Sequence, residues 1–233
     1  MGAPVRNGLK KRERQTKGFI AGLTLGVLFM GILFFPGLSD LHVAGPMNTG
    51  HEEFDCESCH KRAPGTMRQQ VQANIRYLFG ARRDQADFGY ADVDNRACLS
   101  CHDRPNDRHP VFRFVEPRFK EARAAIKPHF CISCHLEHTG NRVTIQKGFC
   151  ITCHQDLELQ KDPIDTSHVQ LIADEQWDTC LGCHDFHGNH DMQAPTEVAN
   201  ALKPEDIGRY FQGGTSPYPG ELIYSAKREA SDE

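Results

Sequence analysis

All ten cysteines of the chain fall into five copies of one pattern, Cys-x-x-Cys-His. In this pattern the two thiols can add to the two vinyl groups of one haem, and the adjacent histidine is then held as the proximal ligand of the iron. The spacing therefore predicts five c-type haems. The copies are Cys56-Glu-Ser-Cys59-His60, Cys98-Leu-Ser-Cys101-His102, Cys131-Ile-Ser-Cys134-His135, Cys150-Ile-Thr-Cys153-His154 and Cys180-Leu-Gly-Cys183-His184.

Two other chemistries use paired cysteines. A zinc ribbon is satisfied by four ligands, so zinc would not require a histidine after every pair. A thioredoxin-like dithiol normally occurs once, beside a βαβ pattern. Five histidines after five pairs favour haem over both alternatives.

The remaining histidines can close the irons. Of thirteen histidines five are proximal, which leaves eight for at most five distal positions. Ligation by two histidines gives closed, low-spin irons that are suited to passing electrons rather than binding substrate. Methionine could substitute at a distal position, and the candidates are Met47, Met67 and Met192.

The stretch "HEEFDCESCHKRAPG" resembles the signature of class III multihaem cytochromes, in which a histidine upstream of one motif commonly ligates a different haem. The resemblance covers residues 51 to 190 and implies that the chain crosslinks its own cofactors. His138 and His187 share one offset in "CHLEH" and "CHDFH". The distal candidates are His51, His109, His138, His168 and His187, and the weaker ones are His129, His190 and His42.

A membrane segment precedes the motifs. Residues 18 to 38 hold no charge across 21 positions, which is enough for a helix to cross a bilayer. The basic residues before it predict a cytoplasmic N-terminus and an extracytoplasmic haem domain. A cleaved signal peptide has the same basic start, but its apolar region is usually only about 7 to 15 residues long. Covalent haem attachment also takes place outside the cytoplasm, so we expect a single-pass protein of the bacterial inner membrane with a periplasmic haem domain.

The expected fold is mostly α and irregular with little regular sheet, because five closely spaced motifs leave no room for separate haem domains. We expect porphyrins packed against one another to form the core. The predicted organisation is a cytoplasmic N-terminus (1–17), a transmembrane helix (18–38), a linker (39–50), a pentahaem domain (51–190) and a C-terminal arm (191–233). Apolar residues at helical spacing between 67 and 78 indicate an amphipathic helix that covers haem edges.

Charge is segregated along the chain. Residues 61 to 83 carry Lys and Arg but no acid, whereas residues 137 to 190 carry nine acids against three Lys or Arg. An acidic face can steer a basic redox protein towards it. The expected partners are therefore the membrane, quinol or subunits of a membrane complex, and a basic periplasmic redox protein, with no nucleic acid.

With one N-terminal anchor, the chain resembles the pentahaem subunit of alternative complex III and, more distantly, the four-haem NapC/NirT quinol dehydrogenases. The first resemblance implies electron transfer from the quinol pool, or from a quinol-oxidising membrane complex, to periplasmic acceptors, as a subunit rather than as an enzyme alone. The second implies a quinol dehydrogenase that feeds a periplasmic reductase. A further alternative is a multihaem reductase of nitrogen or sulfur oxyanions, which would keep one iron open.

Overall fold

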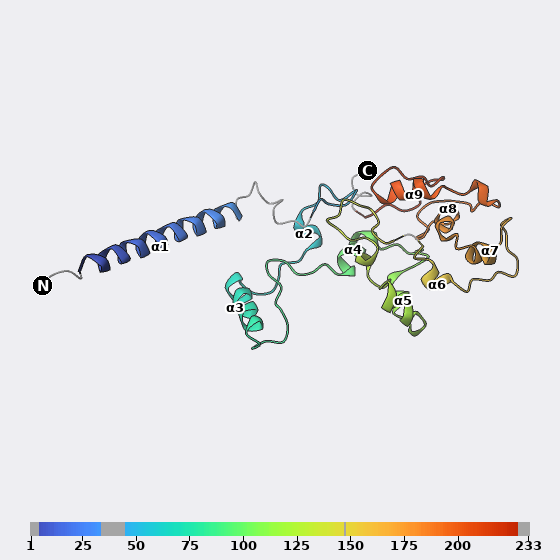
Figure 1. Cartoon of the computed structure of the whole chain (residues 1–233). Helices are drawn as coiled ribbons and strands as arrows, with labels where there is room; N and C mark the ends of the chain where they lie inside the picture. Colours follow the sequence, from blue (N-terminus) through green and yellow to red (C-terminus); the bar gives the residue numbers. More distant parts are fainter. Residues whose placement is uncertain (1–4, 34–44, 147, 228–233) are drawn as a thin grey trace. The chain divides into compact units, whose positions relative to one another are not determined.

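The computed structural model of the chain describes residues 5–33, 45–146 and 148–227. The chain divides into two compact units, with the boundary between Pro46 and Met47. Figure 1 shows the first as a single helix and the second as a set of short helices joined by turns.

The first unit contains α1 (Val5–Leu33). Its stretch from Lys11 to Ile32 is long and apolar enough to cross a membrane, or to act as a signal sequence, and none of it is buried inside the protein. The helix begins before residue 18 because Lys, Arg and Glu are good helix formers, and Glu13 pairs with Lys17 one turn later at 2.7 Å. Residues 34 to 38 of the predicted span, and the linker up to residue 44, lie outside the described residues.

The second unit is mostly helical and irregular. In the described part of the chain no β-strand forms, and β-pairing is limited to isolated bridges such as that between Arg62 and Tyr90. This confirms the predicted fold class at that level. The α-helices are α2 (Cys56–Cys59), α3 (Met67–Leu78), α4 (Asn95–His102), α5 (Lys120–Ala125), α6 (Ile151–His154), α7 (His168–Ala173), α8 (Cys180–Cys183) and α9 (Pro204–Phe211). The 3-10 helices are η2 (Val111–Val115), η3 (Pro117–Phe119), η4 (Cys131–Ser133), η5 (Trp177–Thr179) and η6 (Val198–Asn200).

The apolar core of this unit is sparse. Among the described residues no large side chain is fully buried, and Phe114 and Ile207 are the larger of the few buried apolar residues. A folded domain normally buries well over half of the surface of its unfolded chain. The polypeptide therefore supplies little core of its own, and a core made by porphyrins stays a prediction.

The described residues after 190 pack against the motifs. Ile207 of α9 is only 4% exposed, and the backbone of Ile223 bonds to Asn189 at 2.9 Å. Gly182, inside the fifth motif, allows the close approach, since a Cβ there would lie 2.5 Å from the carbonyl oxygen of Leu202. These contacts use backbone groups and a glycine, which leave no periodic pattern in the sequence.

Candidate functional site: five imidazole pairs

Each Cys-x-x-Cys-His motif lies on or next to a helical turn. The amide of His60 donates to the carbonyl oxygen of Cys56 at 2.8 Å, and the same bond forms from His135, His154 and His184 to the first cysteine of their motifs at 2.9 Å. Residues three and four apart share one face of a helix. The turn therefore places both thiols and the imidazole of a motif on the same side.

Every motif histidine faces a second imidazole from another part of the chain. The five pairs have ring centres between 5.9 and 6.3 Å apart. They are His60 with His138, His102 with His51, His135 with His187, His154 with His109, and His184 with His168. The second members are the five histidines that the sequence favoured as distal ligands.

This separation fits two imidazoles bound to one iron. An imidazole nitrogen lies about 2.0–2.1 Å from a metal ion, so two rings on opposite sides of one metal have centres roughly 6 Å apart. Rings in direct stacking contact lie closer, as His109 and Phe186 do at 4.2 Å. The space between the paired rings therefore has the width that an iron and its two bonds require.

Hydrogen bonds to Nδ1 orient several of these rings. Backbone carbonyls accept from His60, His109 and His135 at 3.2, 2.6 and 2.8 Å. A carbonyl oxygen only accepts, so Nδ1 carries the proton and the Nε2 lone pair is available to a metal. Such contacts to the outer nitrogen are characteristic of histidine ligands.

Three of the second imidazoles bond instead to carboxylates through Nδ1. The distances are 2.5 Å from His51 to Glu137, 2.9 Å from His168 to Asp162 and 3.1 Å from His187 to Asp107. A carboxylate partner fixes the ring orientation and raises the basicity of the ligating nitrogen. These acids could not be predicted from the sequence, because an acid that bonds to a histidine has no fixed spacing from it.

Burial affects the protonation of the paired rings. It lowers the pKa of His135, His109 and His184, which favours the neutral imidazole. At His51 the hydrogen bond that the ring donates to Glu137 outweighs burial and raises the pKa. Neutral imidazole is the form that binds a metal.

Asn48 joins two of the pairs. This residue is 3% exposed, and its Nδ2 donates to the Leu136 carbonyl oxygen at 2.9 Å. Its Oδ1 accepts from the amide and the hydroxyl of Thr139 at 3.2 and 3.1 Å. The side chain thus fastens the segment that carries His51 to the segment that carries His138. His138 itself adopts a φ of 62°, which is uncommon outside glycine and is held by these surroundings.

We expect Asn48→Ala to lower the free energy of unfolding by about 1–3 kcal/mol, because it removes the hydrogen bonds that the buried Asn48 amide makes to Leu136 and Thr139. Denaturant unfolding followed by circular dichroism measures the change. Asn200→Ala is the control, since Asn200 is exposed and bonds only to Glu197, three residues away; this variant should change stability by less than about 0.5 kcal/mol. Equal effects of the two variants would contradict the role given to Asn48.

The weaker distal candidates face no second imidazole among the described ring contacts. His190 bonds to Asp185 at 2.9 Å and stacks on Tyr218. His129 packs on Phe130, and its Nδ1 is buried without a hydrogen-bond partner. His42 lies outside the described residues. Met67 is 57% exposed, and each motif histidine already has an imidazole opposite it.

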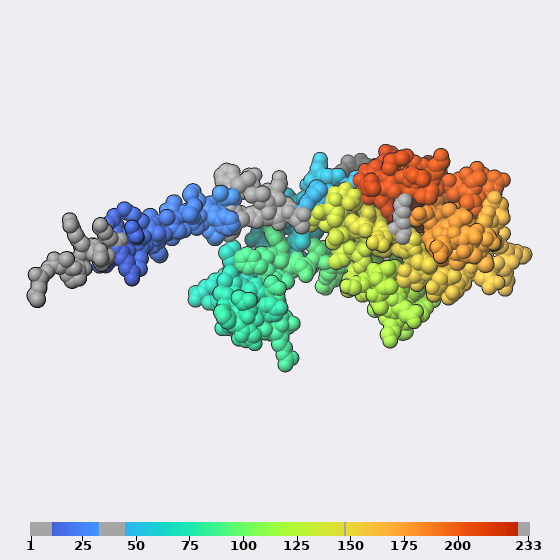
Figure 2. Space-filling model, viewed as in Figure 1, coloured from blue at the N-terminus to red at the C-terminus, as the bar shows by residue number. Residues whose placement is uncertain are grey.

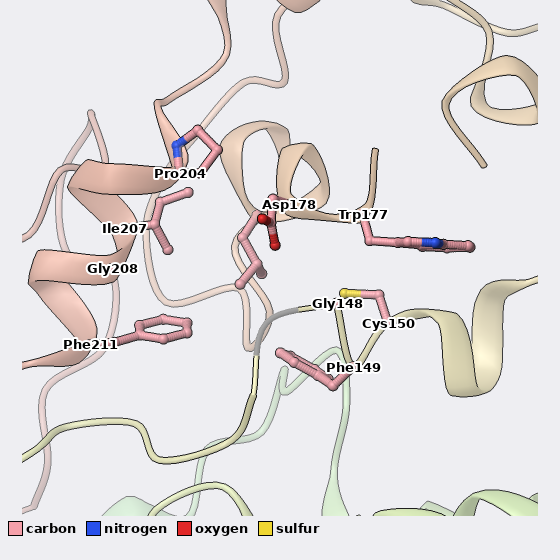
Figure 3. Close-up of a pocket in the computed structure, with 10 residues that line it drawn as sticks. Gly148, Phe149, Cys150, Trp177, Asp178, Pro204, Ile207, Gly208 and Phe211 are labelled. Atoms are coloured by element: carbon pink, nitrogen blue, oxygen red, sulfur yellow. The ribbon is translucent and has the colours of Figure 1, made fainter. Parts of the chain in front are cut away.

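The cysteines of different motifs also meet. Cys98 interacts with Cys131, and Cys150 interacts with Cys180, which raises the pKa of Cys98 and of Cys150. Figure 3 shows an apolar pocket beside Cys150, lined by Phe149, Trp177, Ile207 and Phe211 among others. Thiols of the second and third motifs, and of the fourth and fifth, are therefore neighbours.

Within the described residues no three or more His, Cys, Asp or Glu side chains form a group that could hold a metal ion. Two opposed imidazoles do not need such a group, because a porphyrin supplies the other ligands of its iron. Comparisons of the chain with models of protein families, with curated proteins and with solved structures found no match.

Proposed function

We propose that the chain is a membrane-anchored c-type cytochrome that holds five haems and carries electrons from the quinol pool, or from a quinol-oxidising membrane complex, to periplasmic acceptors. When bound, each haem supplies one-electron redox chemistry. The ten motif cysteines would attach the haems, the motif histidines would be the proximal ligands, and His51, His109, His138, His168 and His187 would be the distal ligands.

One observation carries this proposal: each motif histidine has a second imidazole opposite it at about the distance two axial ligands require. A ligand on both sides leaves an iron no position for substrate. The arrangement therefore supports an electron conduit over a reductase of nitrogen or sulfur oxyanions, which needs an open position.

Neighbouring side chains would act by holding the histidine ligands in fixed orientations. Hydrogen bonds from Nδ1 fix the rings of His51, His168 and His187 against carboxylates. Imidazoles that do not reorient when the charge of the iron changes favour fast transfer, because little of the surroundings must rearrange.

The distal ligands also tie distant segments together. His187 lies close to the fifth motif yet faces His135 of the third motif, and His109 follows the second motif yet faces His154 of the fourth. Loading with haem would therefore crosslink the unit, which compensates for its sparse apolar core. Apoprotein is expected to be the less stable form.

The anchor is α1. We expect the full chain to stay in the membrane fraction after a wash with high salt, because a helix that spans the bilayer is not held by charge. Detergent should release it, as immunoblotting of the fractions would show. A soluble form that begins after residue 38 would mean that a signal peptidase had removed the helix, and would contradict this topology.

The acidic segment, residues 137–190, has fewer charges available to a partner than its composition indicates. Glu137, Asp162 and Asp185 are already bonded to His51, His168 and His190. The other six acids between residues 137 and 190 are exposed, and Asp174, Glu175 and Asp178 gather after α7. We propose that this group receives a basic redox partner, while electrons enter at the site of Cys56, Cys59 and His60.

Charge reversal tests this polarity and the function together. The full chain is placed in nanodiscs, reduced by a quinol, and reoxidised by a basic soluble cytochrome while the haem absorbance is followed. Reversing Asp174, Glu175 and Asp178 to lysine should slow reoxidation by roughly tenfold or more at low salt, and should weaken its salt dependence. Reduction by quinol should not change.

The matched control reverses Glu53, Asp84 and Glu121 to lysine. These exposed acids lie outside the acidic segment, and their reversal gives the same change in net charge. This variant should reoxidise at the rate of the unmodified chain. If the first triple instead blocks reduction and spares reoxidation, the proposed direction is the reverse of the true one. If quinol reduces no haem of this chain, either in nanodiscs or in the native membrane, the proposed function is wrong.

A further inference from the structure

Helix α3 (Met67–Leu78) presents its apolar side to the outside. Its capping box, formed by Thr66 and Gln69, fixes where the helix begins. Met67, Val71, Ile75 and Leu78 follow the helical repeat and are 57, 41, 48 and 78% exposed. Phe79, directly after the helix, is 80% exposed.

The buried side of α3 is polar. Gln70 is 6% exposed, donates from Nε2 to the Ala63 carbonyl oxygen at 3.1 Å and accepts from the Gly89 amide at 3.0 Å. Asn74, one turn later, donates to and accepts from the backbone of Ala86 at 2.9 Å. A surface helix of a soluble domain normally has the opposite arrangement. Hydrogen bonds to its neighbouring loop thus hold α3 with its apolar face outward, on the lobe coloured teal to green in Figure 2.

Exposed cations accompany this apolar face, within the helix and directly after it. Arg68, Arg76, Arg82 and Arg83 are exposed, and no Asp or Glu occurs between residues 61 and 83. In the described part of the chain these four arginines take part in no ion pair, whereas Arg62 is held by Glu57. An exposed apolar strip with arginines beside it is the pattern of a helix that lies in the interface of an anionic bilayer.

We propose that α3 and residues 79–83 form a second membrane contact, in which the apolar face enters the surface of an anionic lipid bilayer and the arginines bind lipid phosphates. An anionic bilayer is the proposed partner because its charge is opposite to that of the arginines. The same chain also carries α1, which is long and apolar enough to cross a membrane. The contact would hold the domain against the membrane surface instead of leaving it on a free tether. It does not require that any haem be bound.

Proteolysis of the full chain in nanodiscs tests the contact. Discs are made of phosphatidylcholine alone or with about one third phosphatidylglycerol, and no other protein is present. Trypsin cleavage after Arg76, Arg82 and Arg83 is expected to be roughly tenfold slower in the anionic discs. Cleavage after Arg113, an exposed arginine in η2, provides the internal reference and should not change.

Two variants separate lipid from other occupants. Leu78→Asp with Phe79→Asp should abolish the protection, and the matched control is Phe112→Asp with Val115→Asp, another exposed apolar pair elsewhere on the domain. Equal cleavage in the two kinds of disc overturns the proposal. So does equal protection in detergent micelles, which would mean that anionic lipid is not required. A change of the haem spectrum in the Leu78 and Phe79 variant also overturns it, because the face would then cover a haem edge.

Discussion

Purified chain is expected to carry five covalently attached haems. Each Cys-x-x-Cys-His motif can form two thioether bonds, and each places its thiols and imidazole on one side of a helical turn. A pyridine haemochrome assay should give five haems per chain, and intact mass under denaturing conditions should show the same number added to the polypeptide. A count of four or fewer, or haem that denaturant and acid extract, would contradict the proposal.

A double substitution makes the count specific to one motif. Cys98→Ala with Cys101→Ala should lower the count to four, because those two sulfurs hold one haem alone. Ser100→Ala, inside the same motif, is the control. Ser100 supplies no thiol, and its hydroxyl bonds only locally, to the Ala97 carbonyl oxygen and the Cys101 sulfur, so this variant should retain five. Retention of five haems by the double variant would mean that its cysteines serve another purpose.

Much of the site could be predicted from sequence because its chemistry is local. Two thiols and an imidazole must follow one another at fixed spacing, so the motif is readable at Cys180, Cys183 and His184 without any knowledge of the fold. The helix at residues 67–78 was predicted for the same reason, since its periodicity is contained in the segment. The apolar segment of α1 is another local signal.

Which of these groups face one another in the fold could not be predicted. Which imidazole faces His135 depends on how segments far apart in sequence return to one another, and His187 is more than fifty residues away. The buried amide of Asn48 bonds to Thr139, and the carboxylate of Asp107 bonds to His187, across still longer separations in sequence. The outward apolar face of α3 is a third case, because periodicity reveals an apolar face but not the direction in which it points.

Replacing His187 with alanine is expected to open one iron while all five haems stay attached. His187 faces His135 at 6.1 Å, so its loss removes one of two axial ligands but none of the thiols. Roughly one fifth of the haem should become high-spin and bind carbon monoxide, and added imidazole should restore the low-spin spectrum. Alanine at His51, His109, His138 or His168 should act in the same way, each on a different haem.

His190→Ala is the matched control for this variant. His190 lies three residues further along the same loop and makes the same kind of bond from Nδ1 to a carboxylate, at 2.9 Å to Asp185. It is also the more buried of the two, with a side chain 10% exposed against 30% for His187. Its ring stacks on Tyr218 instead of facing a motif histidine. The control should therefore lower stability yet leave every haem low-spin and silent to carbon monoxide, because only the ring opposite a proximal histidine can close an iron. A high-spin signal from His190→Ala, together with an unchanged spectrum from His187→Ala, would mean that His190 is the distal ligand. The inference from ring separation would then be wrong.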